Sequence, residues 1–108
     1  MTKELQSSVD RAVQALAEVL KPKQIYLFGS CARGTATTGS DIDLLVVVED
    51  GSGDKLSNTS IAYRATRQLP VSKDIIVDHE SVFKKRASWT SSIEREVFET
   101  GKLVYGRS

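Results

Sequence analysis

The segment "LFGSCARGTATTGSDIDLLVVV", Leu27 to Val48, places Asp41 and Asp43 at the start of an apolar, β-branched run. Such a run is typical of a central strand buried on both faces. Side chains alternate along a strand, so the two aspartates point to the same face, roughly 7 Å apart. Two neighbouring carboxylates repel each other unless a cation lies between them, and Mg²⁺ is the natural hard cation. The segment therefore predicts either a metal-binding strand or, as the alternative, an edge strand ending in solvent.

The rest of the chain alternates helical and strand patterns. A helix is predicted over 5–20, a strand over 24–29, a turn region with one helical turn over 30–40, and the buried strand over 41–49. A mobile loop over 50–58 precedes a helix that is capped by Thr59 or Ser60 and runs to Leu69. A third strand is predicted over 71–79, helices over 81–88 and 91–101, and a short strand or tail over 102–106.

The lengths of the connections indicate how the strands pair. A loop and a helix separate strand 41–49 from strand 71–79, which favours a parallel pair joined by a crossover. Only a short turn region separates strand 24–29 from strand 41–49, which favours an antiparallel pair. The predicted fold class is therefore α/β (α+β), a mixed β-sheet with α-helices packed on it.

The third strand offers a further carboxylate to the aspartate pair. Asp74 lies near the start of this strand and Asp78 near its end, both on one face. Parallel pairing brings Asp74 beside Asp41 and Asp43, whereas antiparallel pairing would bring Asp78 there instead. We therefore expect Asp74 at the metal site and Asp78 at a solvated strand terminus.

Three residues after the first strand suit the phosphates of a nucleotide. An antiparallel first strand brings Gly29 and Ser30 to the start of the second strand. Gly29 lets the backbone approach a ligand closely, and Ser30 supplies a hydroxyl and a main-chain N–H. Arg33 adds a forked donor for the same phosphates. For Ser30 alone, an ordinary turn or cap residue is the alternative.

Composition excludes several classes of protein. With 108 residues, 40% hydrophobic and 27% charged, the sequence is typical of one globular domain over 1–108. Its formal charge of +1 gives no general attraction to nucleic acid or membranes, so direct DNA binding is not predicted. No signal peptide or membrane-spanning run is seen, and a single cysteine suits a reducing compartment, so a cytoplasmic location is predicted.

Other nucleotide-binding and catalytic motifs are missing. The sequence has neither the lysine of a P-loop nor a G-x-G-x-x-G fingerprint. One cysteine and one histidine offer little for a zinc site or a Ser-His-Asp triad. Cys31 is expected to pack as a small apolar residue, His79 to be a cap or surface residue, and Trp89 and Tyr105 to be core or interface anchors.

Gly29-Ser30, ten intervening residues and Asp41-x-Asp43 form the signature of the polymerase-β-like nucleotidyltransferase superfamily. The segments "LFGSCARGTATTGSDIDLLVVVED", "KDIIVDHESVF" and "IEREVFETGKLVYG" resemble its minimal nucleotidyltransferase (MNT) branch. The resemblance implies an αβαβαβ-type core and transfer of a nucleoside monophosphate from a nucleoside triphosphate to an acceptor. It implies that Asp41 and Asp43 coordinate two Mg²⁺ ions, that Asp74 bridges one of them and helps to activate the acceptor hydroxyl, and that Gly29 and Ser30 hold the β- and γ-phosphates.

The resemblance also implies a partner. Members of the MNT branch often lack a substrate-binding domain, and many act as antitoxins that add AMP from ATP to a tyrosine of a HEPN-type toxin. This chain shows no acceptor-binding extension, so a HEPN-domain protein is the predicted acceptor. Two alternatives stay open: a non-catalytic module that binds nucleotide or masks a toxin by contact, and a small-molecule (aminoglycoside-type) nucleotidyltransferase completed by an oligomer or a second subunit. Closure of loop 50–58 over the nucleotide also stays open.

Overall fold

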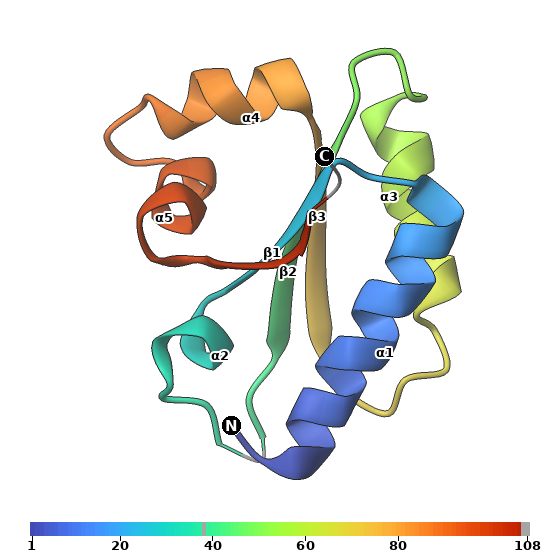
Figure 1. The fold of residues 1–108 in the computed structure, drawn as a ribbon, viewed down its shortest axis with the longest axis vertical. Coiled ribbons are helices and arrows are strands. Elements are labelled where there is room, and N and C mark those ends of the chain that lie inside the picture. The colour runs from blue at the N-terminus through green and yellow to red at the C-terminus, as the bar shows by residue number, and fades with distance from the viewer. Residues whose placement is uncertain (38, 107–108) are drawn as a thin grey trace.

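The computed structural model describes residues 1–37 and 39–106, which form a four-stranded mixed sheet between two layers of helices (Figure 1). Helices α1 and α3 cover one face of the sheet, α4 and α5 lie on the other, and the short helix α2 lies at the end where β1 finishes, with Cys31 and Ala32 in the cluster under α1 and α3. This arrangement confirms the predicted α/β class with helices packed on a mixed sheet. The elements in chain order are α1 (Lys3–Leu20), β1 (Gln24–Phe28), α2 (Ser30–Arg33), β2 (Ile42–Val48), α3 (Lys55–Ala65), β3 (Lys73–His79), α4 (Glu80–Ala87), α5 (Ile93–Thr100) and β4 (Lys102–Gly106).

The strand order is β3-β2-β1-β4, and both predicted pairings are confirmed. β1 runs antiparallel to β2, with Phe28 opposite Asp43. β2 runs parallel to β3, with Asp43 opposite Asp74. The end of β1 and the starts of β2 and β3 therefore meet at one end of the sheet. We call this end the carboxylate rim, defined by Gly29, Asp41, Asp43 and Asp74.

β2 is buried on both faces, as its apolar sequence predicts. Its even-numbered residues, Ile42 to Val48, belong to a core cluster under α1 and α3. Leu45 and Val47 point the other way, into a second cluster that contains Phe28, Phe83 and Val97. Cys31 is buried in the first cluster, which confirms its prediction as a small packing residue. Burial on both sides fixes the register of β2 and hence the face on which Asp43 lies.

Helix α3 begins earlier than predicted. The prediction of a mobile loop over 50–58 is therefore wrong for residues 55–58, which are helical. Asp54, not Thr59 or Ser60, caps the helix, because its carboxylate accepts a 2.8 Å hydrogen bond from the Ser57 N–H. Asn58 is buried inside the first turns, and its amide donates to the Ser52 carbonyl at 2.7 Å. Residues 54–58 thus form a capped helix start rather than a loop. The helix also ends at Ala65, short of the predicted Leu69.

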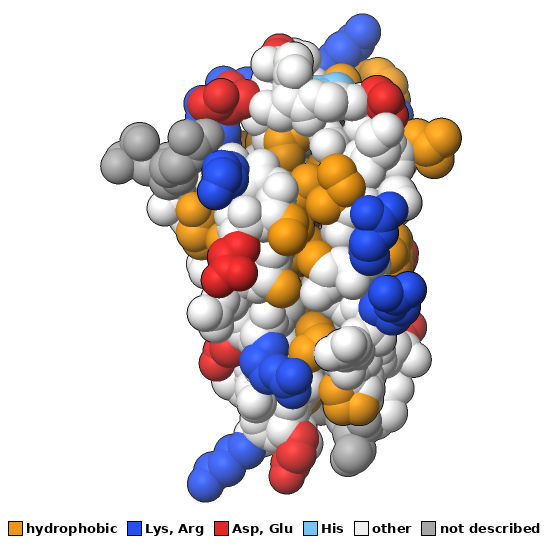
Figure 2. Space-filling view, turned by 90° about the vertical axis from the view of Figure 1, so that its right-hand side faces the viewer, with side chains coloured by type: hydrophobic (Ala, Val, Ile, Leu, Met, Phe, Trp, Pro, Cys, Tyr) orange, Lys and Arg blue, Asp and Glu red, His pale blue; other side chains and the backbone are white. Residues whose placement is uncertain are grey.

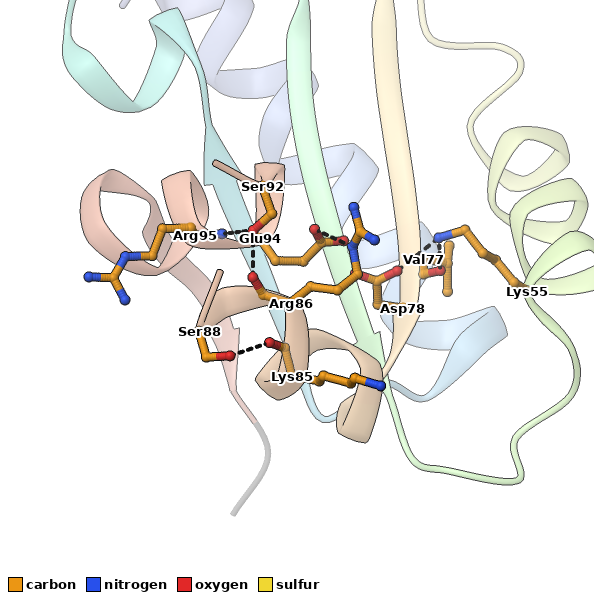
Figure 3. Close-up of polar contacts among 9 residues, drawn as sticks. All are labelled: Lys55, Val77, Asp78, Lys85, Arg86, Ser88, Ser92, Glu94 and Arg95. Carbon is orange, nitrogen blue, oxygen red and sulfur yellow. Dashed lines mark hydrogen bonds and ion pairs between the residues drawn. The ribbon is translucent and has the colours of Figure 1, made fainter. Parts of the chain in front are cut away.

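The expectation that Asp78 lies at a solvated strand terminus is wrong. Asp78 is 2% exposed, and its Oδ1 atom accepts a 2.8 Å hydrogen bond from the Lys55 ammonium group (Figure 3). Glu94 of α5 is also buried, and it pairs with the Arg86 guanidinium of α4 at 2.9 Å. Helices α3, α4 and α5 therefore cover the end of β3, which the strand's own sequence does not reveal.

The pKa values of the two buried carboxyl groups, Asp78 and Glu94, shift in opposite directions. Burial first, and then the hydrogen bond to Glu94, raise the pKa of Asp78 to about 6, against the opposing charge of Lys55. Burial alone would raise the pKa of Glu94, but hydrogen bonds from Asp78 and Arg86 lower it. Asp78 Oδ2 receives no hydrogen bond from any donor in residues 1–37 and 39–106. Asp78 therefore keeps its proton to a higher pH than Glu94 does, and below a pH of about 6 its protonated carboxyl group can donate to Glu94.

The structure places His79, Tyr105 and Trp89 in three different environments. His79 lies at the surface position before α4, where its Nε2 atom is 2.6 Å from the Gly53 carbonyl oxygen. Tyr105 packs against the core, as predicted. Trp89 does not pack in the core, because it is 45% exposed and stacks on Arg86, whose guanidinium carbon is 4.7 Å from the ring centroid; an interface role for Trp89 stays a prediction. In the described part of the chain, no helix has the length and hydropathy needed to cross a bilayer.

Candidate active site

Gly29 brings the end of β1 directly against the Asp43 carboxylate. Its φ of 72° lies in the left-handed region that favours glycine. A Cβ atom at this position would overlap Asp43 Oδ2. The conformation and the close contact with Asp43 both require glycine here, and the predicted approach of a ligand to Gly29 stays a prediction.

Asp43 lies in a region of concentrated negative charge. The pKa of Asp43 is raised first by its burial and then by the charges of Asp74, Asp41 and Glu96, while Arg33 opposes the rise. A bound cation would relieve this repulsion and favour the ionised carboxylate. The negative charge of the carboxylate rim would therefore attract a cation.

The backbone brings Asp43 and Asp74 together as expected, and Asp41 stands two residues before Asp43 at the start of β2. Asp41 and Asp74 are exposed, whereas Asp43 is half-buried. Within the described ranges, no three carboxylate, thiol or imidazole side chains already form a set that could hold a metal ion. The residues nevertheless fit a divalent cation in kind, because hard oxygen donors are what Mg²⁺ prefers, and in the placement of Asp43 and Asp74 on adjacent strands.

Ser30 and Arg33 form the two ends of the single-turn helix α2 that follows Gly29. The Arg33 guanidinium lies 3.5 Å from a Glu96 carboxylate oxygen of α5, and both side chains are about half exposed. Arg33 is therefore accessible beside the rim, but it has an anionic partner that sequence reasoning missed. The pattern over 91–101 predicts a helix, yet nothing in it indicates that Glu96 forms an ion pair with Arg33 of α2.

Tyr63 lies beside the carboxylate rim and, like Glu96, was missed by sequence reasoning. Its hydroxyl lies 3.4 Å from Asp74 Oδ1. It also lines a cleft of about 410 Å³ together with Ser60, Arg64, Arg67 and Lys73. The only signal in the sequence was its position on the helix between the second and third strands, which gives a side chain access to the edge of the third strand.

The remaining surface of the α1–α3 layer shows no comparable chemistry. Figure 2 shows this side of the molecule, with hydrophobic side chains along the middle and Lys and Arg on both flanks. The cleft between α1 and α3, of about 280 Å³, is lined mainly by Arg11, Gln14, Ala15, Glu18, Gln68 and Leu69. It includes none of the residues of the carboxylate rim, so the rim is the candidate site.

The chain matches the family model described as a nucleotidyltransferase domain over residues 9–103. It is 33% identical over 102 residues to "Putative protein adenylyltransferase MJ0604" of Methanocaldococcus jannaschii, covering 89% of this chain and 97% of that protein. A crystal structure of a nucleotidyltransferase from Sulfolobus solfataricus, itself named "putative", covers 99% of this chain and 90% of its own, with a TM-score of 0.64 and 22% identity. A toxin–antitoxin crystal structure with AMP-PNP covers 90% of this chain and 73% of its own, with a TM-score of 0.61 and 26% identity. The resemblance to nucleotidyltransferases is thus confirmed, and the chain belongs to the nucleotidyltransferase domain family.

Proposed function

We propose that this chain is a protein adenylyltransferase that moves AMP from ATP to a hydroxyl group of a HEPN-type toxin, with Mg²⁺ as cofactor. The observation that carries the proposal is the pairing of Asp43 with Asp74 on parallel strands, beside the glycine that closes on Asp43. Support for the acceptor class comes from the relative whose name is that of a protein adenylyltransferase. Support for the nucleotide and the toxin comes from the toxin–antitoxin structure with AMP-PNP.

The triphosphate would lie over the turn from Gly29 to Arg33. Gly29 has no side chain to obstruct the phosphates, and Ser30 offers a hydroxyl and an N–H as donors. Arg33 is exposed and can exchange its Glu96 partner for phosphate oxygens. These three residues bind and orient the leaving pyrophosphate.

The three aspartates would hold magnesium and move one proton. Asp41, Asp43 and Asp74 would hold two Mg²⁺ ions, whose charge would acidify the acceptor hydroxyl and stabilise the departing pyrophosphate. The acceptor oxygen forms a bond to the α-phosphorus as the bond to the β-phosphate oxygen breaks. Asp74, which is exposed at the rim, takes the acceptor proton.

A labelling experiment tests the proposal. The purified chain is incubated with α-labelled ATP and Mg²⁺, alone and with the protein encoded by its neighbouring gene. Label on the partner that is lost in Asp41→Ala and in Asp43→Ala supports the transferase. Asp10→Ala, which removes a carboxylate on α1 that is in no ion pair within the described residues, is the matched control and should keep full labelling.

Two outcomes contradict the proposal. Labelling of the partner that survives Asp43→Ala would place the chemistry elsewhere. Stable binding of the partner with no label on either protein would favour a module that masks the toxin by contact.

A further inference from the structure

We infer that Tyr63 is a positioning residue that holds the Asp74 carboxylate in place for the reaction. The inference rests on the proposed function, because Asp74 is its proton acceptor and one of its metal ligands. Tyr63 belongs to α3, whereas the other residues of the site lie on β2, β3 and α2 or directly before β2 and α2. It adds a residue to the site that the nucleotidyltransferase signature does not contain.

The Tyr63 hydroxyl bridges the backbone of β3 to Asp74. The Ile75 N–H donates a 2.9 Å hydrogen bond to the Tyr63 oxygen. That bond uses the oxygen as an acceptor and leaves the phenolic hydrogen to be donated. Asp74 Oδ1 lies 3.4 Å from the same oxygen and is the acceptor. The Ile75 amide therefore fixes the direction in which the hydroxyl points.

The bridge exists because β3 lies at the edge of the sheet. β2 pairs with only one side of β3, so the Ile75 N–H faces away from the sheet. Helix α3 runs beside this edge and contacts it at a second point, where the Lys55 ammonium donates to the Val77 carbonyl at 3.1 Å. Two contacts, two residues apart along β3, hold the helix and the edge strand together. Tyr63 is thus a fixed support rather than a freely moving side chain.

This support affects how Asp74 meets a cation. Asp74 is exposed, and an exposed carboxylate otherwise samples several rotamers, whose loss on metal binding costs free energy. With Oδ1 bonded to Tyr63, the Oδ2 atom is left free as the metal ligand. Hydrogen-bonded partners of metal ligands typically contribute about 10- to 100-fold in metal affinity or activity. Tyr63 is expected to act at the lower end of that range, because its bond to Asp74 is long.

The test measures metal binding by the purified full-length chain without nucleotide. Mn²⁺ serves as the probe, since it takes the same oxygen ligands and is detected by electron paramagnetic resonance. Tyr63→Phe removes only the hydroxyl and should weaken Mn²⁺ binding about 10-fold. Tyr105→Phe is the matched control, because the Tyr105 hydroxyl makes no hydrogen bond within the described residues, and its affinity should stay within about twofold. Hydrogen exchange of the Ile75 amide should accelerate only in Tyr63→Phe.

A double-mutant cycle separates positioning from a general structural role. If Tyr63 acts through Asp74, then adding Tyr63→Phe to Asp74→Asn should cause no further loss of Mn²⁺ affinity. An equal loss in both backgrounds, or no loss in the single variant, would overturn the role of Tyr63. If Asp74→Asn alone leaves Mn²⁺ binding unchanged, the metal site of the proposed function fails, and this inference fails with it. Mass spectrometry after incubation with ATP and Mg²⁺ adds a last check, because AMP found on Tyr63 would make it an acceptor instead.

Discussion

At Gly29 the backbone takes a left-handed conformation, and the Asp43 carboxylate fills the space that a side chain would need. Gly34, five residues later, has a similar φ of 78°, but apart from its chain neighbours no heavy atom of the described residues lies within 4 Å of a Cβ built there. Both positions therefore favour glycine for its left-handed backbone, but only Gly29 also requires glycine because a side chain would not fit.

Alanine substitutions at these two positions should have different effects on nucleotide binding. Both variants should lose about 1–2 kcal/mol of unfolding free energy, because a left-handed backbone is unfavourable for alanine. Only Gly29→Ala displaces the Asp43 carboxylate, so only this variant should lose binding of ATP with Mg²⁺. Calorimetric titration and chemical denaturation measure the two effects, and equal nucleotide affinity in both variants would contradict this account of Gly29.

The Asp78–Glu94 pair should make the stability of the protein depend on pH. Asp78 has a pKa of about 6 in the folded protein, against about 3.9 in an unfolded chain. Between these values the folded state binds more protons than the unfolded state, so the unfolding free energy falls as pH rises from about 4 to above 6. The lowered pKa of Glu94 acts in the opposite sense, but only below its ordinary value of 4.5.

We therefore expect the melting temperature to be higher at pH 5 than at pH 7.5, with a difference in unfolding free energy of roughly 1.4 kcal/mol, because pH 5 lies about one unit below the folded pKa of Asp78. Asp78→Asn keeps a donor toward Glu94 and does not titrate, so the dependence over this range should largely disappear. Differential scanning calorimetry across the range measures it. A wild-type protein that is more stable at pH 7.5 would show that the proton is not shared between these two acids.

At the scale of single elements, β2 was the easiest to predict and α3 the hardest. The run from Ile42 to Val48 is apolar on both faces, so only a central strand accommodates it. Helix α3 begins in a polar, glycine-containing stretch, where the cap depends on two hydrogen bonds from Ser57 to the Asp54 carboxylate. Sequence reasoning placed the cap at Thr59 or Ser60, because the apolar stripe begins only after them.

The position of the cap can be tested by alanine substitution. Asp54→Ala should cost about 1 kcal/mol of unfolding free energy, since it removes the side-chain acceptor at the N-cap. Ser60→Ala, at an exposed position inside the helix, should change stability little, because alanine is the better helix former. Urea denaturation of both variants measures the difference. A larger loss of unfolding free energy in Ser60→Ala than in Asp54→Ala would instead support the helix start expected from the sequence.

At the scale of the whole molecule, the parallel and antiparallel pairings could be predicted because connection lengths restrict them. That reasoning was enough to place Asp74 opposite Asp43 and to separate Asp78 from both. Connection lengths could not place Tyr63, Glu96 or Glu94. The partner of each depends on how the helices pack on the sheet and on one another. The site residues proposed from the signature thus remain predictions for the experiments described above.

Binding of nucleotide and metal should stabilise the whole fold in a linked manner. ATP at 100 times its dissociation constant adds about 2.7 kcal/mol to the unfolding free energy if only the native state binds it. The negative charges around Asp43 oppose the triphosphate unless a cation is present. Thermal shifts with ATP should therefore be large with Mg²⁺ and small with EDTA. An equal shift in both conditions would contradict a metal bridge between the carboxylates and the phosphates.

The contacts of Tyr63 and Lys55 along β3 have a consequence for association between copies. Side chains of α3 already occupy an amide and a carbonyl on that border of the sheet, whereas β4 forms the opposite border, with Leu103 55% exposed. Strand addition from another chain can then proceed from β4 alone. Growth of this kind would stop at two copies, because each added copy presents a β3 border on which the Ile75 N–H and the Val77 carbonyl are already bonded to α3.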